Sequence, residues 1–458
     1  MCGVFGIRSE ERDVSRLAYF GLFALQHRGQ ESAGIAVSDR GRLTVVRDMG
    51  LVAQVFDEQQ LQALPGEVAI GHTRYSTTGA NRWANAQPLI HHGRVRTIAL
   101  GHNGNLVNVE ALRTELQEDG VKLMSGSDSE VIAALIARDP APLTDAVAAT
   151  MARLEGAYTV TALAEGVLVA FRDPLGFRPL TLGRIGEDWV VASESCALDL
   201  IAADVVRDVR PGEIVWIDEE GLHNAQAAPA GKNAHCIFEH IYLARPDSRL
   251  AGVEVHGARV RMGETLAREA PAEADLVIGV PDSGTPAAIG FSKASGIPFN
   301  EALIKNRYVA RTFIQPDQAM REQGIRMKFN PLDEVEGKRI VVVDDTIVRA
   351  NTTRQLVAML LEAGASEVHV RISSPPVVSP CFYGIDFPDE DELPAAHRSV
   401  EEMRQLIGAT SLHYLSVDGM QAATLLPEDS VCRACFTRDY PTRVPPRTEK
   451  LRFETARA

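Results

Sequence analysis

Hydrophobic and polar residues alternate in short runs through the first half of the chain, and glycine punctuates these runs. Alternation with a period of two is typical of strands that bury one face, so the pattern predicts a layered, largely antiparallel sheet. Two stretches among the runs, around 14–27 and 128–138, are predicted to be helices. The predicted strands lie in EVAIGHTRYST, RTIALGHNGNL, EGVLVAFRD, WVVASES and GEIVWID.

The pattern changes after AQAAPAGKNAH (225–235), whose small and polar residues predict a linker. Beyond it, apolar strands alternate with amphipathic helices. ADLVIGVPDSGTPAAIGFSKASG predicts strand, loop and helix, and KRIVVVDDTIVRANTTRQLVAMLLEAGASEVHVRI predicts a βαβ unit. The second half should therefore hold a parallel sheet with ligands at the carboxyl ends of its strands. We expect two domains, residues 2–230 and 231–458.

Composition narrows the possible functions. The net charge of −14 disfavours general nucleic-acid binding, because neutralising phosphates needs a basic excess. No apolar run approaches the roughly 20 residues that span a bilayer. The N-terminus MCGVFGIRSEERD lacks the basic start and apolar core of a signal peptide. We expect a cytoplasmic protein with no membrane partner, whose six cysteines stay reduced.

Cys2 is a candidate nucleophile. Removal of Met1 would place an α-amino group beside its thiol, and such an amine has a pKa of about 7.7–8.0, near the ideal for a general base. One residue would then supply both nucleophile and base. Because Cys2 follows Met1 directly, we expect maturation to need only methionine removal. A cysteine at this position, taken alone, is more often a small buried residue.

Three further segments supply what glutamine hydrolysis needs. Arg74, in GHTRYSTTG, has a planar fork that suits an amino-acid carboxylate. Asn103 and the Gly104 backbone N–H, in GHNGN, are natural oxyanion donors, although Asn-Gly alone usually marks a turn. Asp128 begins a helix, where it would cap that helix or bind a substrate ammonium. Arg74 alone would also fit a surface ion pair, but together with Cys2 these residues favour a glutaminase.

The strings CGVFGI, QHRGQESAGI, GHTRYSTTG, GHNGNL and SDSE together resemble the N-terminal-nucleophile glutamine amidotransferases. The resemblance implies a four-layer αββα domain of the N-terminal-nucleophile hydrolase type. It implies Cys2 as the nucleophile, with Asn103 and Gly104 as the oxyanion hole. Glutamine binding is assigned by the same resemblance to Arg28, Gly29, Arg74 and Asp128.

A second group of candidates follows the apolar strand IVVVDD. The adjacent carboxylates of Asp344 and Asp345 suit a ribose diol or Mg²⁺, because both prefer hard oxygen partners. The loop TIVRANTT opens a helix whose N-terminus suits a phosphate. Acidic pairs are also common at solvated strand ends, but the full string resembles the 5-phosphoribosyl-diphosphate motif of type I phosphoribosyltransferases, an α/β fold. That resemblance implies substrate contacts from Asp344, Asp345, Thr346, Ile347, Val348, Arg349, Ala350, Asn351, Thr352 and Thr353.

Two more strings extend the resemblance. VPDSG resembles the family's pyrophosphate loop, and Ser283 matches a position associated with Mg²⁺, alongside Asp344 and Asp345. KNRYVARTFIQP resembles a loop that closes over the substrate. The cationic candidates, which in most proteins would be solvent-facing charges, are Lys305, Arg307 and Arg311, with Lys328 in MKFNP.

Nearly the whole chain thus resembles the amidophosphoribosyltransferase family, the glutamine-dependent first enzymes of purine synthesis. The resemblance implies that ammonia from glutamine displaces pyrophosphate from 5-phosphoribosyl 1-diphosphate, giving 5-phosphoribosylamine. It also implies an internal ammonia channel, feedback inhibition by purine nucleotides and a homo-oligomer, either dimer or tetramer.

The chain departs from the family at two places. The family usually has RGTTS where this chain has Arg349-Ala350-Asn351-Thr352-Thr353, and often has glycine at Ala310. Ala350 adds a Cβ where the backbone should approach a phosphate, and it disfavours positive φ. The amide of Asn351 replaces a hydroxyl but still donates hydrogen bonds. We expect an intact pocket with altered affinity.

Four cysteines remain as candidate metal ligands. Cys432 and Cys435 have C-x-x-C spacing, and Cys236 and Cys381 lie far upstream. Spacing leaves open zinc, an iron–sulfur cluster, a redox pair or no site at all. The flanking strings HCIFEHIYLARPDS and SPCFYGID resemble the iron–sulfur subgroup of the family, which implies a 4Fe-4S cluster on all four thiols. Cys196 is interpreted as a buried small residue.

Two other functions fit parts of the sequence. A glutamine-dependent hexosamine synthase would share the first half, but it would carry sugar-isomerase domains in place of the DDTIVRANTT string. A non-catalytic regulator that senses phosphoribosyl diphosphate would share the second fold. The intact set of Cys2, Arg74, Asn103 and Asp128 disfavours such a regulator.

Overall fold

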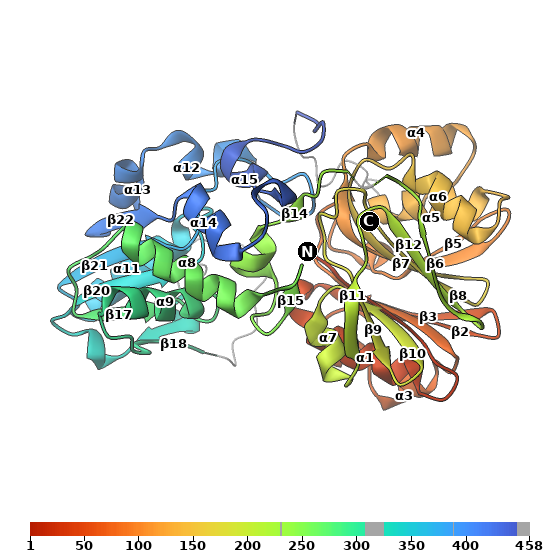
Figure 1. The fold of residues 1–458 in the computed structure, drawn as a ribbon, viewed down its shortest axis with the longest axis horizontal. Coiled ribbons are helices and arrows are strands. Elements are labelled where there is room, and N and C mark those ends of the chain that lie inside the picture. Colours follow the sequence, from red (N-terminus) through yellow and green to blue (C-terminus); the bar gives the residue numbers. More distant parts are fainter. Residues whose placement is uncertain (230, 307–324, 388, 447–458) are drawn as a thin grey trace.

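The computed structural model describes residues 1–229, 231–306, 325–387 and 389–446. Figure 1 shows two bodies side by side, one built on stacked sheets and one on a smaller sheet flanked by helices, with the N-terminus between them. These bodies correspond to the first and second halves of the chain.

Two antiparallel sheets form the first body. One has seven strands in the order β11-β9-β10-β1-β4-β2-β3, and the other has six in the order β13-β12-β8-β7-β6-β5. The strands of the first sheet are β1 (Gly3–Arg8), β2 (Ser32–Asp39), β3 (Arg42–Met49), β4 (Val68–Arg74), β9 (Thr181–Ile185), β10 (Asp188–Ala192) and β11 (Asp204–Asp208). Those of the second are β5 (Leu89–His92), β6 (Thr97–Leu106), β7 (Gly156–Ala164), β8 (Val167–Arg172), β12 (Glu213–Asp218) and β13 (Gly221–Gln226).

The two sheets pack face to face across a core that includes Val4, Ile70 and Leu163. Helices cover both outer faces, so the body has the four-layer αββα arrangement that the family resemblance implied. The first sheet is covered by α1 (Val14–Ala24), α2 (Val52–Val55), α3 (Glu58–Gln62) and α7 (Ser195–Leu200). The second is covered by α4 (Val109–Glu118), α5 (Asp128–Arg138) and α6 (Leu143–Met151).

A parallel sheet in the order β17-β20-β21-β22 forms the second body. Its apolar strands are buried on both faces, as parallel sheets require. The strands are β17 (Leu276–Gly279), β20 (Arg339–Asp344), β21 (Glu367–Ile372) and β22 (Ser411–Tyr414). One face packs on α8 (Val255–Glu269), α9 (Thr285–Ser295) and α14 (Val417–Thr424), and the other on α11 (Asn351–Glu362) and α13 (Val400–Ile407).

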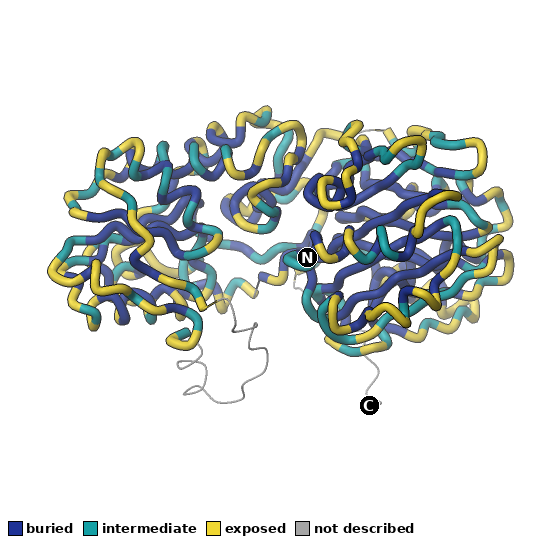
Figure 2. Tube along the Cα trace, turned by 90° about the horizontal axis from the view of Figure 1, so that it is seen from below, coloured by how far each residue is buried: buried dark blue, intermediate teal, exposed yellow. Residues whose placement is uncertain are grey.

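Short elements complete the second body. They are β14 (His235–Cys236), the π-helical turn η3 (Glu239–Leu243), β15 (Arg249–Leu250), β16 (Val253–Glu254), β18 (Leu303–Lys305), β19 (Phe329–Pro331), α12 (Pro394–His397), β23 (Val431–Cys432) and α15 (Ala434–Thr437). Figure 2 shows the N-terminus at the junction of the two bodies, among buried segments of both. Met1 itself packs into the core of the second body.

The predicted elements are confirmed with small differences at their ends. The helix expected over 14–27 ends at Ala24 and is followed by a 3₁₀ turn, η1 (Gln26–Arg28). The strand–loop–helix pattern of the second half is present as β17–α9 and β20–α11–β21. β13 extends to Gln226, inside the expected linker, and the domain boundary at 230 stays a prediction. Among the described residues, no helix is both long and apolar enough to span a bilayer.

Candidate active sites at the junction of two bodies

Cys2 lies immediately before β1, and only 6% of its surface is exposed. Its Sγ is 3.5 Å from the carbonyl oxygen of Tyr75, and its backbone N–H donates to Oδ1 of Asn103 at 3.3 Å. In the unprocessed chain the terminal amine belongs to Met1, and burial lowers the pKa of that amine to about 5. Loss of Met1 would leave an amine at the Cys2 nitrogen, within reach of Asn103.

Asn103 carries a buried donor without an acceptor in the described part of the chain. The residue is fully buried, and its side-chain Nδ2 has no hydrogen-bond partner among the residues that the structure describes. Buried polar groups are normally paired, because an unpaired one costs about 1–3 kcal/mol. An unpaired donor next to a nucleophile is therefore a candidate for binding a negative charge that forms during the reaction.

The Gly104 peptide faces the same region. Tyr158 lies opposite Gly104 in the β6–β7 pair. The N–H and carbonyl of Tyr158 nevertheless form hydrogen bonds with Asp173, on the side of β7 that faces away from β6. The N–H groups of His102 and Leu106 donate to side chains at the open edge of β6. Alternate N–H groups of a strand point the same way, so the N–H of Gly104 points to that edge as well. Its φ of +143° restricts the position to glycine.

Arg74 is buried rather than on the surface, so the alternative of a surface ion pair is wrong. Its guanidinium donates to the carbonyls of Thr78 at 3.1 Å, Gly79 at 3.3 Å and Ala80 at 3.1 Å. The loop 75–80 therefore wraps around this cation. Thr77 from the same loop donates to the carbonyl of Gly104 at 3.4 Å, which places the loop beside the oxyanion donors.

Asp128 is the first residue of α5, but it does not cap the helix as one of the two sequence alternatives suggested. Ser127 is the N-cap, and its hydroxyl accepts from the N–H of Ser129. The Asp128 carboxylate instead accepts from the N–H of Leu106 at 3.1 Å and lies 3.7 Å from His102. Burial by itself would raise the pKa of Asp128, but His102 and the hydrogen bonds outweigh burial and lower it. The carboxylate is ionised and suits an ammonium group.

Gly29 and Arg28 occupy different environments. A Cβ on Gly29 would lie 2.5–2.6 Å from the backbone of Thr73 and Arg74, so this loop packs directly on β4. The guanidinium of Arg28 donates to the carbonyl of Cys2 at 2.9 Å. It also forms a bidentate pair with Glu239 at 2.8 and 3.0 Å, so its side chain binds the nucleophile's own backbone.

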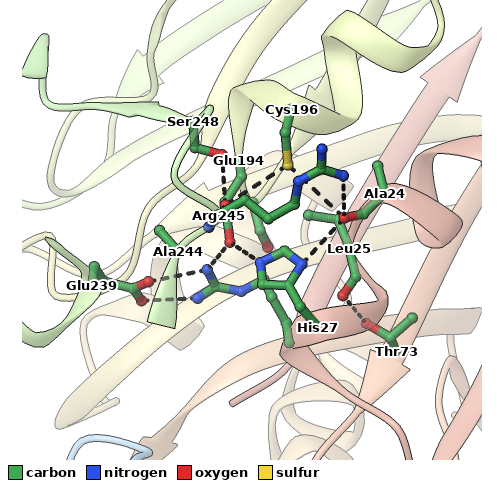
Figure 3. Close-up of polar contacts among 12 residues, drawn as sticks. Ala24, Leu25, His27, Thr73, Glu194, Cys196, Glu239, Ala244, Arg245 and Ser248 are labelled. Carbon is green, nitrogen blue, oxygen red and sulfur yellow. Dashed lines mark hydrogen bonds and ion pairs between the residues drawn. The ribbon is translucent and has the colours of Figure 1, made fainter. Parts of the chain in front are cut away.

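Sequence reasoning missed a buried ionic network behind Cys2. Figure 3 shows Glu194 at its centre, where its carboxylate accepts from the Ser248 hydroxyl and the Arg245 backbone N–H and pairs with the His27 ring. Arg28 joins Glu194 to Glu239 of the second body, and both carboxylates are fully buried. Burial alone would raise the pKa of Glu194, but His27 and Arg28 hold it well below its usual range. The only signal in the sequence is a glutamate inside an apolar run, which is too common to identify partners.

The second candidate site lies at the carboxyl end of β20. Asp344 and Asp345 are both more than 90% buried. Burial raises the pKa of both carboxyls, and the neighbouring Asp345 raises that of Asp344 further. Hydrogen bonds from Ser283 and Thr346 act in the opposite direction on the pKa of Asp345, so Ser283 lies beside the carboxylate pair, and its assignment to Mg²⁺ stays a prediction. Two carboxylates and a hydroxyl are hard oxygen donors that fit Mg²⁺, an ion often held by one or two carboxylates plus substrate oxygens.

The loop from Thr346 to Ala350 leads into α11. Ala350 is the N-cap with φ +62°, a left-handed conformation that a Cβ disfavours, and no side chain caps the helix. Arg349 pairs with Glu392 at 3.2 Å on the surface. Five further predicted contacts lie in the same loop and in the first residues of α11. They are Ile347, Val348, Asn351, Thr352 and Thr353.

A cavity of about 1060 Å³ lies beside the VPDSG loop and is lined by Asp282, Thr285 and Lys305. The Nζ of Lys305 pairs with Asp282 at 2.6 Å. The backbone of Lys328 accepts from Asn306 beside this cavity. Arg307, Ala310 and Arg311 lie outside the described residues.

The four predicted cysteine ligands come together from three segments. β14 and β23 pair in parallel with Cys236 opposite Cys432, and Tyr383 N–H donates to the Sγ of Cys381 at 3.4 Å. The pKa of Cys435 is raised well above its usual value by burial first and then by the other three thiols. In the described part of the chain, no set of three or more His, Cys, Asp or Glu side chains is placed to hold a metal ion. Cys196 lies elsewhere and is 2% exposed, as predicted.

Comparison with known proteins gives both halves a family. Residues 72–200 match the model of a glutamine amidotransferase domain, and residues 261–373 match that of a phosphoribosyl transferase domain. The amidophosphoribosyltransferase of Mycobacterium tuberculosis is 53% identical over 98% of this chain and 87% of its own length. That of Synechococcus elongatus is 52% identical over 100% and 95%. The structure of glutamine phosphoribosylpyrophosphate amidotransferase from Bacillus subtilis complexed with ADP and GMP covers 98% of this chain and 99% of its own, with 46% identity and a TM-score of 0.92.

Proposed function

This chain belongs to the amidophosphoribosyltransferase family, and from that premise we propose how its residues divide the reaction. The enzyme is a glutamine-dependent phosphoribosyltransferase, hence a glycosyltransferase, and it catalyses the first step of purine biosynthesis. The first domain (2–230) releases ammonia from glutamine, and the second (231–458) transfers it to 5-phosphoribosyl 1-diphosphate.

In the first domain, the thiol of Cys2 attacks the glutamine amide. The α-amine freed by loss of Met1 accepts the thiol proton and passes it to the departing ammonia. Water then hydrolyses the thioester to glutamate. Arg74 binds the α-carboxylate of glutamine and Asp128 binds its ammonium group, while the loop of Arg28 and Gly29 completes the pocket.

The observation that best supports this assignment is the buried Nδ2 of Asn103 beside Cys2, which has no partner among the residues that the structure describes. Together with the N–H of Gly104, it supplies two donors for the tetrahedral oxyanion. Such donors act strongly where they are buried, as Asn103 is, and losing one typically costs about 10²–10³ in turnover.

In the second domain, the helix start at 346–353 binds the 5-phosphate, and Asp344 and Asp345 hold the ribose hydroxyls. Ser283, Asp344 and Asp345 would hold Mg²⁺, which neutralises the leaving pyrophosphate when it is bound. Lys305 and Lys328, with Arg307, bind the diphosphate. Ammonia displaces pyrophosphate at the ribose C1, and we infer that it travels inside the protein, since Arg28 joins the carbonyl of Cys2 to Glu239 of the second domain.

Cys236, Cys381, Cys432 and Cys435 would ligate a 4Fe-4S cluster with a structural or oxygen-sensing function. Their convergence and mutual electrostatic effect support a shared ligand. Iron and sulfide analysis of anaerobically and aerobically purified protein tests this; zinc without iron or sulfide would refute it.

Two properties of the relatives are proposed for this enzyme as well. Feedback inhibition by purine nucleotides is supported by the B. subtilis structure, which is complexed with ADP and GMP. A homo-oligomer, dimer or tetramer, is proposed from the family resemblance.

The assay for the whole proposal measures pyrophosphate release that depends on phosphoribosyl diphosphate, with either glutamine or ammonium as nitrogen donor. Cys2→Ala should abolish glutamine-dependent release and keep ammonium-dependent release. Cys196→Ala, which removes another buried thiol, should keep both. A protein with neither activity would instead support the non-catalytic regulator, and mass spectrometry that found Met1 retained on active enzyme would refute the N-terminal base.

A further inference from the structure

A segment of the second domain lies against Gly104, the residue of the first domain whose N–H is a proposed oxyanion donor. The carbonyl of Phe382 accepts from Nδ2 of Asn105 at 3.1 Å. The carbonyl of the next residue, Tyr383, accepts twice from the buried guanidinium of Arg178, at 2.9 and 2.6 Å. Both donors belong to the first domain, so two consecutive peptides of residues 381–386 are fixed to it by side-chain hydrogen bonds.

Gly384 follows directly and touches the backbone of Gly104. A Cβ placed on Gly384 would lie 3.0 Å from both the carbonyl carbon and the carbonyl oxygen of Gly104, and 3.2 Å from its Cα. A Cβ on Gly104 would in turn meet the carbonyl oxygen of Ala157 at 2.1 Å. The Gly104 peptide is therefore confined by main chain from both domains, and neither contact leaves space for a side chain.

Asn105 links this contact to the glutamine loop. Its Oδ1 accepts from the hydroxyl of Thr78 at 2.5 Å, while its Nδ2 donates to Phe382. The carbonyl of Thr78 accepts from Arg74, the proposed ligand of the glutamine carboxylate. One amide side chain thus connects the loop around Arg74, the strand of the oxyanion hole and the segment from the second domain.

We propose that Gly384 and Asn105 are positioning residues for glutamine hydrolysis. Gly384 confines the Cα and carbonyl group of Gly104 and thereby the direction of its N–H, and Asn105 fixes Gly384 by anchoring Phe382. Their contribution is made to the oxyanion, which exists only in the tetrahedral intermediates and not in bound glutamine, so it affects turnover more than glutamine binding. The inference rests on the proposed function of Asn103 and Gly104 as the oxyanion hole.

The test is Gly384→Ala, with Gly296→Ala as the matched control. Like Gly384, Gly296 has positive φ (+77°) and lies in the second domain. At Gly296, however, a Cβ would meet no neighbouring atom within 4 Å. We expect Gly384→Ala to lower kcat for glutamine hydrolysis by about tenfold or more, within the range for a displaced oxyanion donor. The KM for glutamine and ammonium-dependent synthesis should stay within about twofold of wild type. Gly296→Ala should leave all three unchanged.

Unchanged kcat for hydrolysis in Gly384→Ala, or an equal loss of ammonium-dependent synthesis, would overturn the proposal. If Gly384→Ala does not fold, Asn105→Asp answers the same question. This substitution keeps the acceptor for Thr78 and replaces the donor to Phe382 with an acceptor, so it should reproduce the selective loss of kcat. Wild-type hydrolysis in folded Asn105→Asp would then overturn the proposal.

Asn103→Ala tests the proposed oxyanion hole itself, so it distinguishes failure of that assignment from failure of this inference. If Asn103→Ala retains glutamine hydrolysis, the oxyanion hole itself is wrongly assigned. If Asn103→Ala loses hydrolysis while Gly384→Ala and Asn105→Asp keep it, the oxyanion hole stands and only the contribution of the second domain is rejected.

Discussion

The two candidate sites are built in opposite ways. The glutamine site joins Cys2, Arg74, Asn103 and Asp128, which are far apart in sequence and are brought together by two packed sheets. The phosphoribosyl site takes most of its proposed ligands from one continuous segment, 344–353. The first site therefore depends on packing between distant elements, and the second depends on the local backbone of one loop. We therefore expect changes in domain packing to impair the first site, and changes in the 344–353 loop to impair the second.

The largest effect that separates the sites should come from Asp345→Asn. Removing one of two buried carboxylates takes away a proposed ligand of Mg²⁺ and of the ribose. Synthesis should fall by about 100-fold or more with either nitrogen donor, since such electrostatic stabilisation contributes several kcal/mol. Glutamine hydrolysis without phosphoribosyl diphosphate should remain at the wild-type rate.

Asp275→Asn is the control for this prediction. Asp275 is an exposed carboxylate paired with Arg339 at the start of β20, away from the carboxyl end where Asp345 lies. Both activities should survive its loss. A parallel fall in hydrolysis and synthesis for Asp345→Asn would show that the two sites are not separable in this way.

The next effect should come from Glu239→Gln, which tests the packing on which the glutamine site depends. Glu239 neutralises Arg28 and Arg178, and all three are fully buried. Leaving buried arginines without this charge should lower the free energy of unfolding by about 3–5 kcal/mol. Glutamine hydrolysis should also fall, because Arg28 holds the carbonyl of Cys2.

Chemical denaturation and glutaminase assays measure both effects. The comparison variant is Glu401→Gln, which breaks a surface pair with Arg404 and should cost less than about 1 kcal/mol. Equal losses of stability in the two variants would mean that the buried network contributes no more than a surface ion pair.

This contrast also explains what the sequence could and could not predict. Periodicity predicted β6, β8, β20 and α11, because local patterns determine those elements. The motifs also predicted Cys2, Asn103 and Asp345 as site residues, because residue types report the chemistry that they can serve, and these assignments stay predictions. The sequence did not reveal the contact of Gly384 with Gly104 or the pairing of Arg28 with Glu239. Both contacts join residues more than 200 positions apart, and their partners are defined only by how the two domains pack.

Varying the pH should also distinguish the two sites, through a smaller difference in how their ligand affinities change. Burial raises the pKa of Asp344 and Asp345, whereas Asp128 has a lowered pKa. A group with a raised pKa becomes protonated at a higher pH, so the affinity for Mg²⁺ and phosphoribosyl diphosphate should weaken first as pH falls. Glutamine binding should persist to lower pH, because Asp128 stays ionised.

Calorimetric titration of Cys2→Ala between about pH 5 and 8 measures both affinities without turnover, in the range where such shifts alter charge. Parallel pH dependence of glutamine and phosphoribosyl-diphosphate binding would contradict the opposite pKa directions. The Asp345→Asn substitution should reduce the acid dependence of diphosphate binding to the part that Asp344 contributes, and it should keep the glutamine curve.

The smallest effect should come from Ala350→Gly, which tests the local backbone of the second site. Ala350 has φ +62°, and a left-handed conformation costs an alanine about 1 kcal/mol relative to glycine. Glycine removes this strain and the Cβ beside the proposed phosphate, so the KM for phosphoribosyl diphosphate should change by a few-fold while glutamine hydrolysis stays constant. Ala251→Gly is the matched control, because Ala251 also has positive φ (+49°) but lies exposed in the turn between β15 and β16. Relief of strain alone would stabilise both variants similarly. Only a KM change confined to Ala350→Gly would therefore show that the Cβ of Ala350 affects substrate binding.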